Sequence, residues 1–213
     1  MRYASAAPTV RVAALPSDAL SVADLGELGL NAVLNGAATP EQVATLREEF
    51  ARSNERLLER TASEARAGAR IIFWAEGNAP VLAADAADLI ARGQALAQQE
   101  QIYLGMALAV FTPEATQPLE NQVILVQPDG TLGFTYLKAF PVPGVEALAS
   151  VRGPAEMPTL DTPYGRIAAV ICFGRRCVRS RAGAQQRLAD KQRRARGPCA
   201  DAAHAHALQP HRR

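Results

Sequence analysis

The chain of 213 residues is long enough for one domain with a hydrophobic core, and its 48% apolar content is typical of a soluble globular protein. No stretch approaches the roughly 18 apolar residues of a membrane span, and the N-terminus lacks the apolar segment of a signal peptide, so we expect neither secretion nor membrane insertion. The net charge of +2 conceals two segments: residues 1–173 hold 12 Lys and Arg against 19 Asp and Glu (net −7), and residues 174–213 hold 11 against 2 (net +9).

The two segments also differ in their aromatic residues. All 11 aromatic residues lie in 1–173, whereas all three histidines lie in 174–213. We therefore expect a flexible leader at 1–9, a folded domain at 10–173 and a basic tail at 174–213 that is disordered or loosely helical. The three cysteines, Cys172, Cys177 and Cys199, cannot all pair with one another, which favours a reducing, cytoplasmic setting.

The first elements predicted are a strand and a long helix. Residues 10–15 (VRVAAL) read as a strand, and residues 19–38 as loop with short helical pieces. Thr39 followed by Pro40, with Gln42 three residues after the cap, predicts a helix that runs to about Ala67 and ends at Gly68. Its apolar positions form one stripe that would face a core: Val43, Leu46, Phe50, Leu57, Leu58 and Ala65.

A second strand-and-helix unit follows. Residues 69–74 (ARIIFW) predict a buried strand, and Glu76 comes directly after it in a loop rich in Gly, Asn and Pro. Open α/β sheets keep their active sites at such strand ends, although a lone loop glutamate in solvent is the commoner case. Asp85 and Asp88 then begin a helix through Gln98. Two successive units of this kind indicate a layered α/β fold.

Three consecutive strands are predicted next, at residues 103–111, 121–128 and 131–138. Residues 128–130 (PDG) join the last two as a tight hairpin turn, so the sheet is expected to mix parallel and antiparallel strands. Lys138 ends the third strand. A loop containing two prolines leads from it to Glu146.

The last predicted strand carries a cysteine. Residues 159–165 read as a turn, and Gly165–Phe173 (GRIAAVICF) reads as a strand buried on both faces that delivers Cys172 near its end. A cysteine in such a place is often an inert core residue. Glu76, Lys138 and Glu146 favour the alternative, a nucleophile.

These four residue types suit attack on an amide, nitrile or ester carbon. A thiol with a pKa of about 8.5 is mostly protonated at neutral pH and needs a base, which Glu76 would supply. Lys138 would stabilise the oxyanion of the tetrahedral intermediate. Glu146 would orient Lys138 or Glu76 and assist the water that cleaves the thioester.

The sequence resembles the nitrilase or carbon-nitrogen hydrolase superfamily, whose catalytic set is Glu, Lys and Cys in that order with a second Glu after the Lys. The strings that carry the resemblance are IIFWAEGNAP around Glu76, GFTYLKAFPVPGVE around Lys138 and Glu146, and TPYGRIAAVICF around Cys172. Together they span roughly residues 10–173. Five residues match places typical of the apolipoprotein N-acyltransferase-like branch: Trp74, Tyr136, Pro143, Glu146 and Gly165.

The resemblance implies the front part of an α-β-β-α sandwich and an amidase or N-acyltransferase-like enzyme that forms a Cys172 thioester, with no cofactor and no metal. The partner would be a small-molecule amide, nitrile or acyl substrate, with a homo-oligomer left open and a membrane only if the full gene encodes transmembrane helices. The competing hypothesis is a non-catalytic, incomplete copy of the fold that acts by interaction alone.

The segment after Phe173 departs from the family, since Gly174 stands where members usually have an acidic residue. A frame-shifted or truncated reading of a longer gene explains the tail's composition better than a nucleic-acid-binding arm, because the tail lacks aromatic residues that stack on bases. A metal site at Cys199, His204 and His206 lacks a fourth spaced ligand. For the chain as it stands we expect weak activity, because such a tail cannot cover the sheet.

Overall fold

The computed structural model describes residues 9–16, 20–171 and 179–180. The chain divides into two units, Met1–Val178 and Arg179–Arg213, and of the second unit only the two-residue strand β10 (Arg179–Ser180) is described. Cys172 lies outside the described residues. So do the leader and, apart from β10, the predicted basic tail with Cys177 and Cys199.

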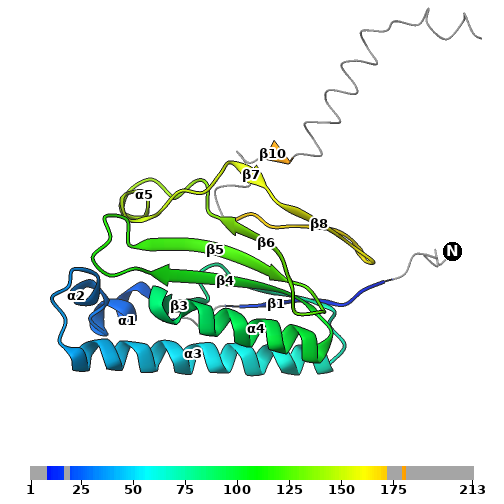
Figure 1. Cartoon of the computed structure of the whole chain (residues 1–213), viewed down its shortest axis with the longest axis horizontal. Helices are drawn as coiled ribbons and strands as arrows, with labels where there is room; N and C mark the ends of the chain where they lie inside the picture. Colours follow the sequence, from blue (N-terminus) through cyan, green and yellow to red (C-terminus); the bar gives the residue numbers. More distant parts are fainter. Residues whose placement is uncertain (1–8, 17–19, 172–178, 181–213) are drawn as a thin grey trace, which may run out of the picture. The chain divides into compact units, whose positions relative to one another are not determined.

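The centre of the first unit is a mixed six-stranded sheet (Figure 1). Its strand order is β1-β2-β4-β5-β6. The strand β3 also pairs with β4, at residues 108–111, whereas β2 pairs with residues 103–105. Strands β1, β2, β3 and β4 run parallel, whereas β4, β5 and β6 pair antiparallel. The strands span β1 Val12–Leu15, β2 Ile71–Trp74, β3 Ala79–Leu82, β4 Tyr103–Phe111, β5 Leu119–Val126 and β6 Leu132–Leu137. The predicted mixed sheet is confirmed.

Two long helices, α3 (Pro40–Arg66) and α4 (Ala86–Glu100), lie side by side over one face of this sheet (Figure 1). The start of α3 is the predicted one: the Thr39 hydroxyl accepts a hydrogen bond from the Gln42 N–H, and the Gln42 side chain accepts one from the Thr39 N–H. The remaining helical pieces are short: α1 Val22–Glu27, α2 Leu30–Leu34, the 3₁₀ turn η1 Ala83–Asp85 and α5 Val145–Ala149.

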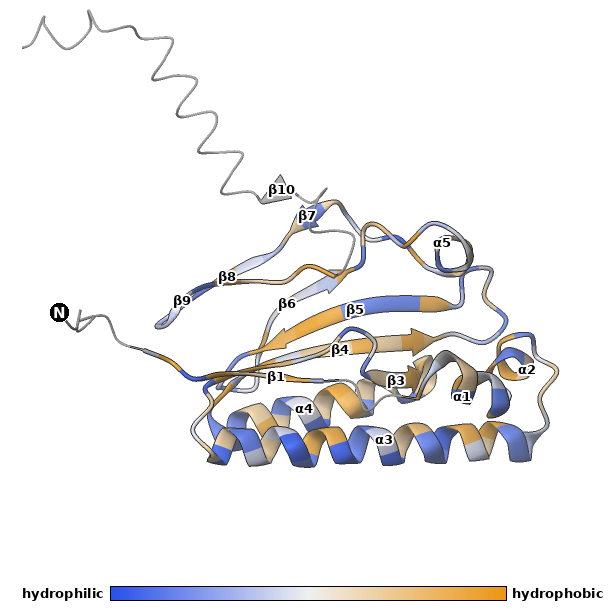
Figure 2. Ribbon diagram, turned by 180° about the vertical axis from the view of Figure 1, so that it is seen from behind, coloured by the Kyte–Doolittle hydropathy of each residue, from blue (hydrophilic) through white to orange (hydrophobic). Residues whose placement is uncertain are grey.

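Hydropathy follows this layering. The strand β4 is largely apolar along its length and β5 is polar near its start and apolar toward its end, whereas α3 alternates polar and apolar positions (Figure 2). Leu46, Phe50, Leu57, Leu58 and Ala65, five of the six predicted stripe positions of α3, are buried, as the helical period requires. Within the described residues, none of the helices has the length and hydropathy that crossing a bilayer demands.

The prediction of a strand buried on both faces at 165–173 is wrong for residues 165–171, the part that the structure describes. Strand β9 covers only Gly165–Ala168 and pairs antiparallel with β8 (Thr159–Thr162) in a separate two-stranded hairpin. Charge explains the difference, because Arg166 pairs with Asp161 across the hairpin and both side chains stay in solvent. Beyond β9 the chain has no strand up to residue 171 but returns to the core, where Ala169 and Ile171 are buried.

The hairpin packs on the sheet through a few apolar side chains. Leu160 and Ile167 lie against a small buried cluster of Ile71, Tyr103 and Leu125. A two-residue strand, β7 (Glu156–Met157), precedes β8. This end of the chain is therefore attached to the sheet by side-chain contacts rather than as a seventh strand.

The sequence analysis did not predict the strands β3, β7, β8 and β10, and β8 occupies part of residues 159–165, which were expected to be a turn. Residues 79–80 were expected to be loop, yet they begin β3, which pairs with β4 from Ala79 opposite Leu108 to Leu82 opposite Phe111. A strand with a neighbour on one side only tolerates a proline, here Pro80, because only alternate N–H groups enter the pairing. The Pro80 carbonyl accepts a hydrogen bond from Asn54 of α3, which ties β3 to the helix layer.

Candidate functional site

Glu76 lies in a tight turn that follows the parallel strand β2, as the sequence predicts. The Asn78 N–H donates to the Ala75 carbonyl at 3.0 Å, which closes the turn around Glu76 and Gly77. Gly77 has φ of +65°, a conformation that a side chain disfavours, so glycine permits this turn directly beside the carboxylate. The Asn78 side chain donates to the Pro16 carbonyl at 3.3 Å and anchors the turn to the end of β1.

This turn lies between two strands, β2 and β3, that pair with successive parts of β4. Phe73 of β2 is opposite Gly105, and Ala79 of β3 is opposite Leu108, so six residue steps on one side match three on the other. The three extra residues must leave the sheet, and Glu76 is at the middle of that excursion. The sheet itself therefore fixes where Glu76 projects.

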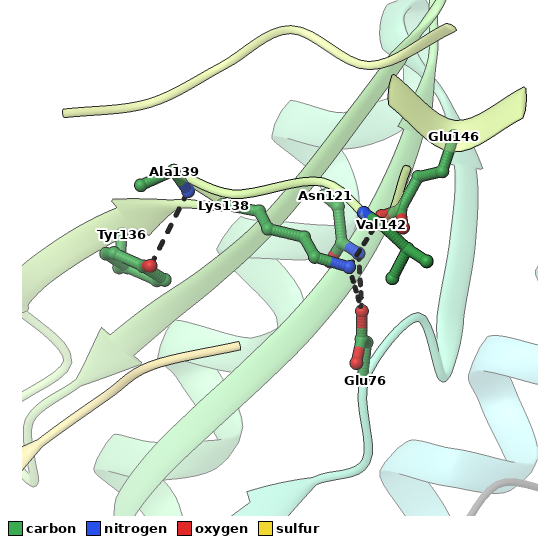
Figure 3. A network of polar contacts seen from close by, with 7 residues as sticks. All are labelled: Glu76, Asn121, Tyr136, Lys138, Ala139, Val142 and Glu146. Carbon is green, nitrogen blue, oxygen red and sulfur yellow. Dashed lines mark hydrogen bonds and ion pairs between the residues drawn. The ribbon is translucent and has the colours of Figure 1, made fainter. Parts of the chain in front are cut away.

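Lys138 is held by its backbone as well as by its side chain. It follows β6 directly, and its N–H donates to the Asn121 carbonyl on β5 at 2.8 Å while its own carbonyl accepts from the Gly153 N–H at 3.1 Å. Only 1% of its side chain is exposed. The ammonium Nζ donates to Glu76 Oε1 at 2.8 Å and to Glu146 Oε1 at 2.6 Å (Figure 3).

Glu146 enters from the opposite side, on the short helix α5. Its Oε1 accepts from Lys138, and its Oε2 accepts from the Val142 N–H at 2.8 Å, in the loop with two prolines. Both carboxylate oxygens are thus occupied. The structure brings Glu76, Lys138 and Glu146, which are up to 70 residues apart in the chain, into one hydrogen-bonded cluster.

The electrostatics of the cluster favour its charged forms. Burial alone would lower the pKa of Lys138, but the hydrogen bonds and charges of Glu146 and Glu76 outweigh it and raise that pKa above its ordinary value. Burial opposes ionisation of Glu146 too, yet the hydrogen bonds from Lys138 and Val142 hold its pKa below the ordinary value. With all three groups ionised the cluster has a net charge of −1. Among the described residues no group of three or more His, Cys, Asp or Glu side chains is arranged to hold a metal.

Asn121 also belongs to this cluster, and it was not among the candidate residues of the sequence. Its Nδ2 donates to Glu76 Oε1 at 2.9 Å, and the residue is buried (Figure 3). The signal available beforehand was a polar side chain at the start of an otherwise apolar predicted strand. That signal is weak, because polar residues are common at strand ends.

A cavity of about 290 Å³ opens beside the cluster. Glu76 lines it together with Trp74 and the apolar side chains of Phe73, Ala107 and Val123. Residues 168–171 complete the lining, and Cys172 is the next residue in the chain. The second oxygen of Glu76, Oε2, accepts no hydrogen bond from the described residues.

The sequence profile of one family, carbon-nitrogen hydrolase, matches residues 35–190, well over half of the chain. The chain belongs to the carbon-nitrogen hydrolase family. The match begins before α3 and includes Glu76, Lys138, Glu146 and Cys172. The predicted superfamily is therefore confirmed.

Solved structures agree with this family at the level of the fold. A double mutant of the amidase from Nesterenkonia sp. AN1 in complex with acrylamide superposes with a TM-score of 0.51 at 17% identity, covering 58% of this chain and 50% of that one. Another mutant of that amidase, titled as showing Michael addition of acrylamide at the active site cysteine, gives 0.51 and 17%, with 58% and 52% covered. A carbon-nitrogen hydrolase from Helicobacter pylori G27 gives 0.49 and 19%, with 58% and 47% covered.

The chain thus spans about half the length of these solved carbon-nitrogen hydrolases. A search of curated proteins found no significant match.

Proposed function

We propose that the chain has the site of an amidase, in which the Cys172 thiol attacks a small amide and forms a thioester. The observation that carries this proposal is the shared cavity. Glu76, bonded to the buried Lys138, lines the same cavity as residues 168–171, which lead directly to Cys172. Membership of the carbon-nitrogen hydrolase family supports the same reaction class.

Glu76 is the group we assign as general base. Glu146 has both oxygens occupied and a pKa held below its ordinary value, so it is the poorer proton acceptor. Glu76 has one oxygen unoccupied by the described residues and lines the cavity.

The proposed first half-reaction transfers one proton and exchanges one bond. Glu76 takes the thiol proton as sulfur attacks the carbonyl carbon, and the carbonyl oxygen becomes an oxyanion. Lys138 uses two of its three N–H groups on Glu76 and Glu146, which leaves one for that oxyanion. When the tetrahedral intermediate collapses, Glu76 returns the proton to the leaving amine and the thioester remains.

The second half-reaction decides between hydrolysis and acyl transfer. In hydrolysis, Glu76 takes a proton from water as the water oxygen attacks the thioester carbon. When this second tetrahedral intermediate collapses, the carbon–sulfur bond breaks and Glu76 returns the proton to the sulfur, which leaves the free thiol and a carboxylic acid. We favour hydrolysis because 38% of the Glu76 side chain is exposed, so water reaches the base. The N-acyltransferase-like alternative, with an amine as acceptor, draws on the resemblance at Trp74 and Tyr136. Both are buried; Trp74 lines the cavity without offering a charged group to an amine, and Tyr136 is not part of the lining.

The substrate class follows from the lining of the cavity. A volume of about 290 Å³ is at the small end for ligand sites, and most lining side chains are apolar. We therefore propose a short aliphatic amide.

Intact mass spectrometry after incubation with acetamide, acetonitrile and an acetyl ester tests the proposal. We expect an acetyl adduct that peptide mapping assigns to Cys172, that is absent in Cys172→Ser, and that Glu76→Gln slows strongly. Cys177 and Cys199 are internal controls for non-specific thiol chemistry. Absence of any adduct on Cys172, with the chain folded, would favour the non-catalytic alternative. Adding an amine such as glycine amide then shows whether the acyl group passes to water or to nitrogen.

A further inference from the structure

Asn121 contacts the cluster through both its side chain and its backbone. The Nδ2 group donates to Glu76 Oε1 at 2.9 Å, the same oxygen that accepts from Lys138 Nζ. The Asn121 carbonyl accepts the Lys138 N–H at 2.8 Å. One residue of β5 therefore fixes the position of the base by its side chain and that of the lysine by its backbone.

The two donors to Glu76 differ in stiffness. Lys138 reaches Glu76 at the end of a flexible four-carbon side chain, whereas Asn121 reaches it from a short side chain on β5, which is paired on both sides by β4 and β6. Glu76 itself is in a turn with a glycine neighbour and is more than a third exposed. Its orientation thus depends on these two hydrogen bonds, and Asn121 supplies the stiffer one.

The donor must also be neutral. Glu76 and Glu146 already share one ammonium, so two negative charges meet at this position. An aspartate of the same shape would add a third negative charge to a buried position. An amide donates to a carboxylate without altering the net charge of the cluster.

We propose that Asn121 is a positioning residue for Glu76, holding Oε1 so that Oε2 is presented to the cavity that Glu76 and residues 168–171 line. This inference rests on the proposed amidase function for its catalytic consequence. Its structural content, an orientation of Glu76 that depends on Asn121, stands without that function.

The kinetic test uses two variants and a matched control. Asn121→Ala deletes the side chain, and Asn121→Asp keeps its shape but removes the N–H donor. Asn54→Ala is the control, because Asn54 is also buried, also donates one Nδ2 hydrogen bond, to the Pro80 carbonyl, and also has a buried Oδ1 without a partner, yet it lies outside the cluster.

With acetamide as substrate and ammonia release as readout, we expect both Asn121 variants to lose about 10- to 100-fold in kcat/KM, the usual weight of a hydrogen bond to a charged group. The loss should fall on kcat, with KM within about twofold, because the contact orients a reacting group and does not bind substrate. Asn54→Ala should retain kcat within about threefold, even if its melting temperature falls as much as that of Asn121→Ala. Equal kcat values for Asn121→Ala and Asn54→Ala would overturn the inference and leave the amidase proposal intact.

A crystal structure of Asn121→Ala gives a readout that does not depend on turnover. We expect Glu76 to occupy more than one carboxylate orientation in the variant and a single one in the unmodified chain and in Asn54→Ala. If the unmodified chain forms no adduct on Cys172 but Glu76 is released in Asn121→Ala, the amidase proposal fails and the positioning role stands. A Glu76 side chain that keeps its orientation without Asn121 overturns the inference.

Discussion

The cluster around Lys138 and the helix layer of α3, η1 and α4 both contain ion pairs between a cation and carboxylates, but in opposite surroundings. Lys138 is 1% exposed and bonds two carboxylates, whereas the arginines that link the helix layer, Arg47, Arg66 and Arg92, are 40–65% exposed and bond one each. Their partners are Asp85, Glu100 and Glu55.

The two kinds of ion pair are expected to differ in how much they contribute to the free energy of unfolding. Water and salt screen an exposed pair, and its side chains lose conformational freedom on pairing, so it contributes little. A buried charge needs its partners, because removing one partner leaves an uncompensated charge in the protein interior, which solvates charges poorly.

The largest effect is expected at Lys138. Lys138→Met retains much of the apolar length of the side chain but leaves Glu76 and Glu146 facing each other without a cation. We expect a loss of about 3–5 kcal/mol in the free energy of unfolding, measured by urea denaturation. The same substitution at the exposed arginine, Arg66→Met, is the control and should cost under about 1 kcal/mol. Similar losses for both variants would contradict the contrast.

A steric change beside Lys138 is expected to come next. A methyl group on Gly153 would overlap the backbone carbonyl of Leu137, the residue before Lys138, whereas one on Gly93 of α4 would meet only the flexible end of Met106. We expect Gly153→Ala to cost about 1–3 kcal/mol and to lower activity, since the backbone around Lys138 must move.

Gly93→Ala is the matched control in the helix layer. Alanine is favoured over glycine inside a helix by about 1 kcal/mol, and Met106 can change its rotamer, so the net change in melting temperature should be small. A larger loss at Gly93 than at Gly153 would show that the helix layer is the more tightly packed of the two regions.

A smaller, pH-dependent effect is expected at Glu146. Because its pKa lies below the ordinary value of 4.5 in the folded chain, its contribution to stability is present at neutral pH and disappears as the pH falls below about 4.5. Glu146→Gln should therefore be less stable than the unmodified chain by about 1 kcal/mol at pH 7, and this difference should shrink as the pH falls below 4.5 and through the folded pKa of Glu146.

Melting curves of both proteins at several pH values measure that difference, in which the titration of all other acids largely cancels. The raised pKa of Lys138 acts at the other end of the scale, where its contribution is lost only as the pH rises above 10.5 and through its folded value. A stability difference that stays constant between pH 7 and 3 would mean that Glu146 does not titrate through its pairing with Lys138.

The smallest effects are expected at the exposed pairs of the helix layer. Arg66→Ala and Arg92→Ala should each change the free energy of unfolding by about 0.2–1 kcal/mol, and the change should diminish in 1 M salt. Thermal melts at low and high salt provide the measurement. A loss above 2 kcal/mol that salt leaves unchanged would show that these exposed pairs contribute to stability as a buried pair does.

Much of the helix layer and sheet could be predicted because its signals are local. The capping box at Thr39, the apolar stripe of α3 and the turn at residues 128–130 each involve residues within a few positions of one another. Glu76 and Lys138 could be predicted as strand-end residues for the same reason. Strand β3 could not, since it depends on a pairing with β4 that offsets the unfavourable signal of Pro80.

The apolar run at 165–171 was misread because local composition does not distinguish a buried sheet strand from a short hairpin followed by core contacts. The Arg166–Asp161 pair that keeps β8 and β9 in solvent forms only when the hairpin closes. Asn121 was missed for a related reason, as its partner Glu76 is 45 residues away.

The sequence by itself determined which chemical groups are present, a Glu after one strand, a Lys after another, a Glu beyond a proline loop and a Cys after an apolar run, and the family to which their order belongs. Only the tertiary structure decided which of the described groups meet, and their meeting raises the pKa of Lys138 and lowers that of Glu146. The pairing of β4 with β2 and β3 expels Glu76 from the sheet, the pairing of β5 with β6 places Lys138 beside it, and burial of the ammonium makes both carboxylates necessary. Such contacts join residues far apart in the chain, and their energies depend on solvent exclusion that no local pattern encodes.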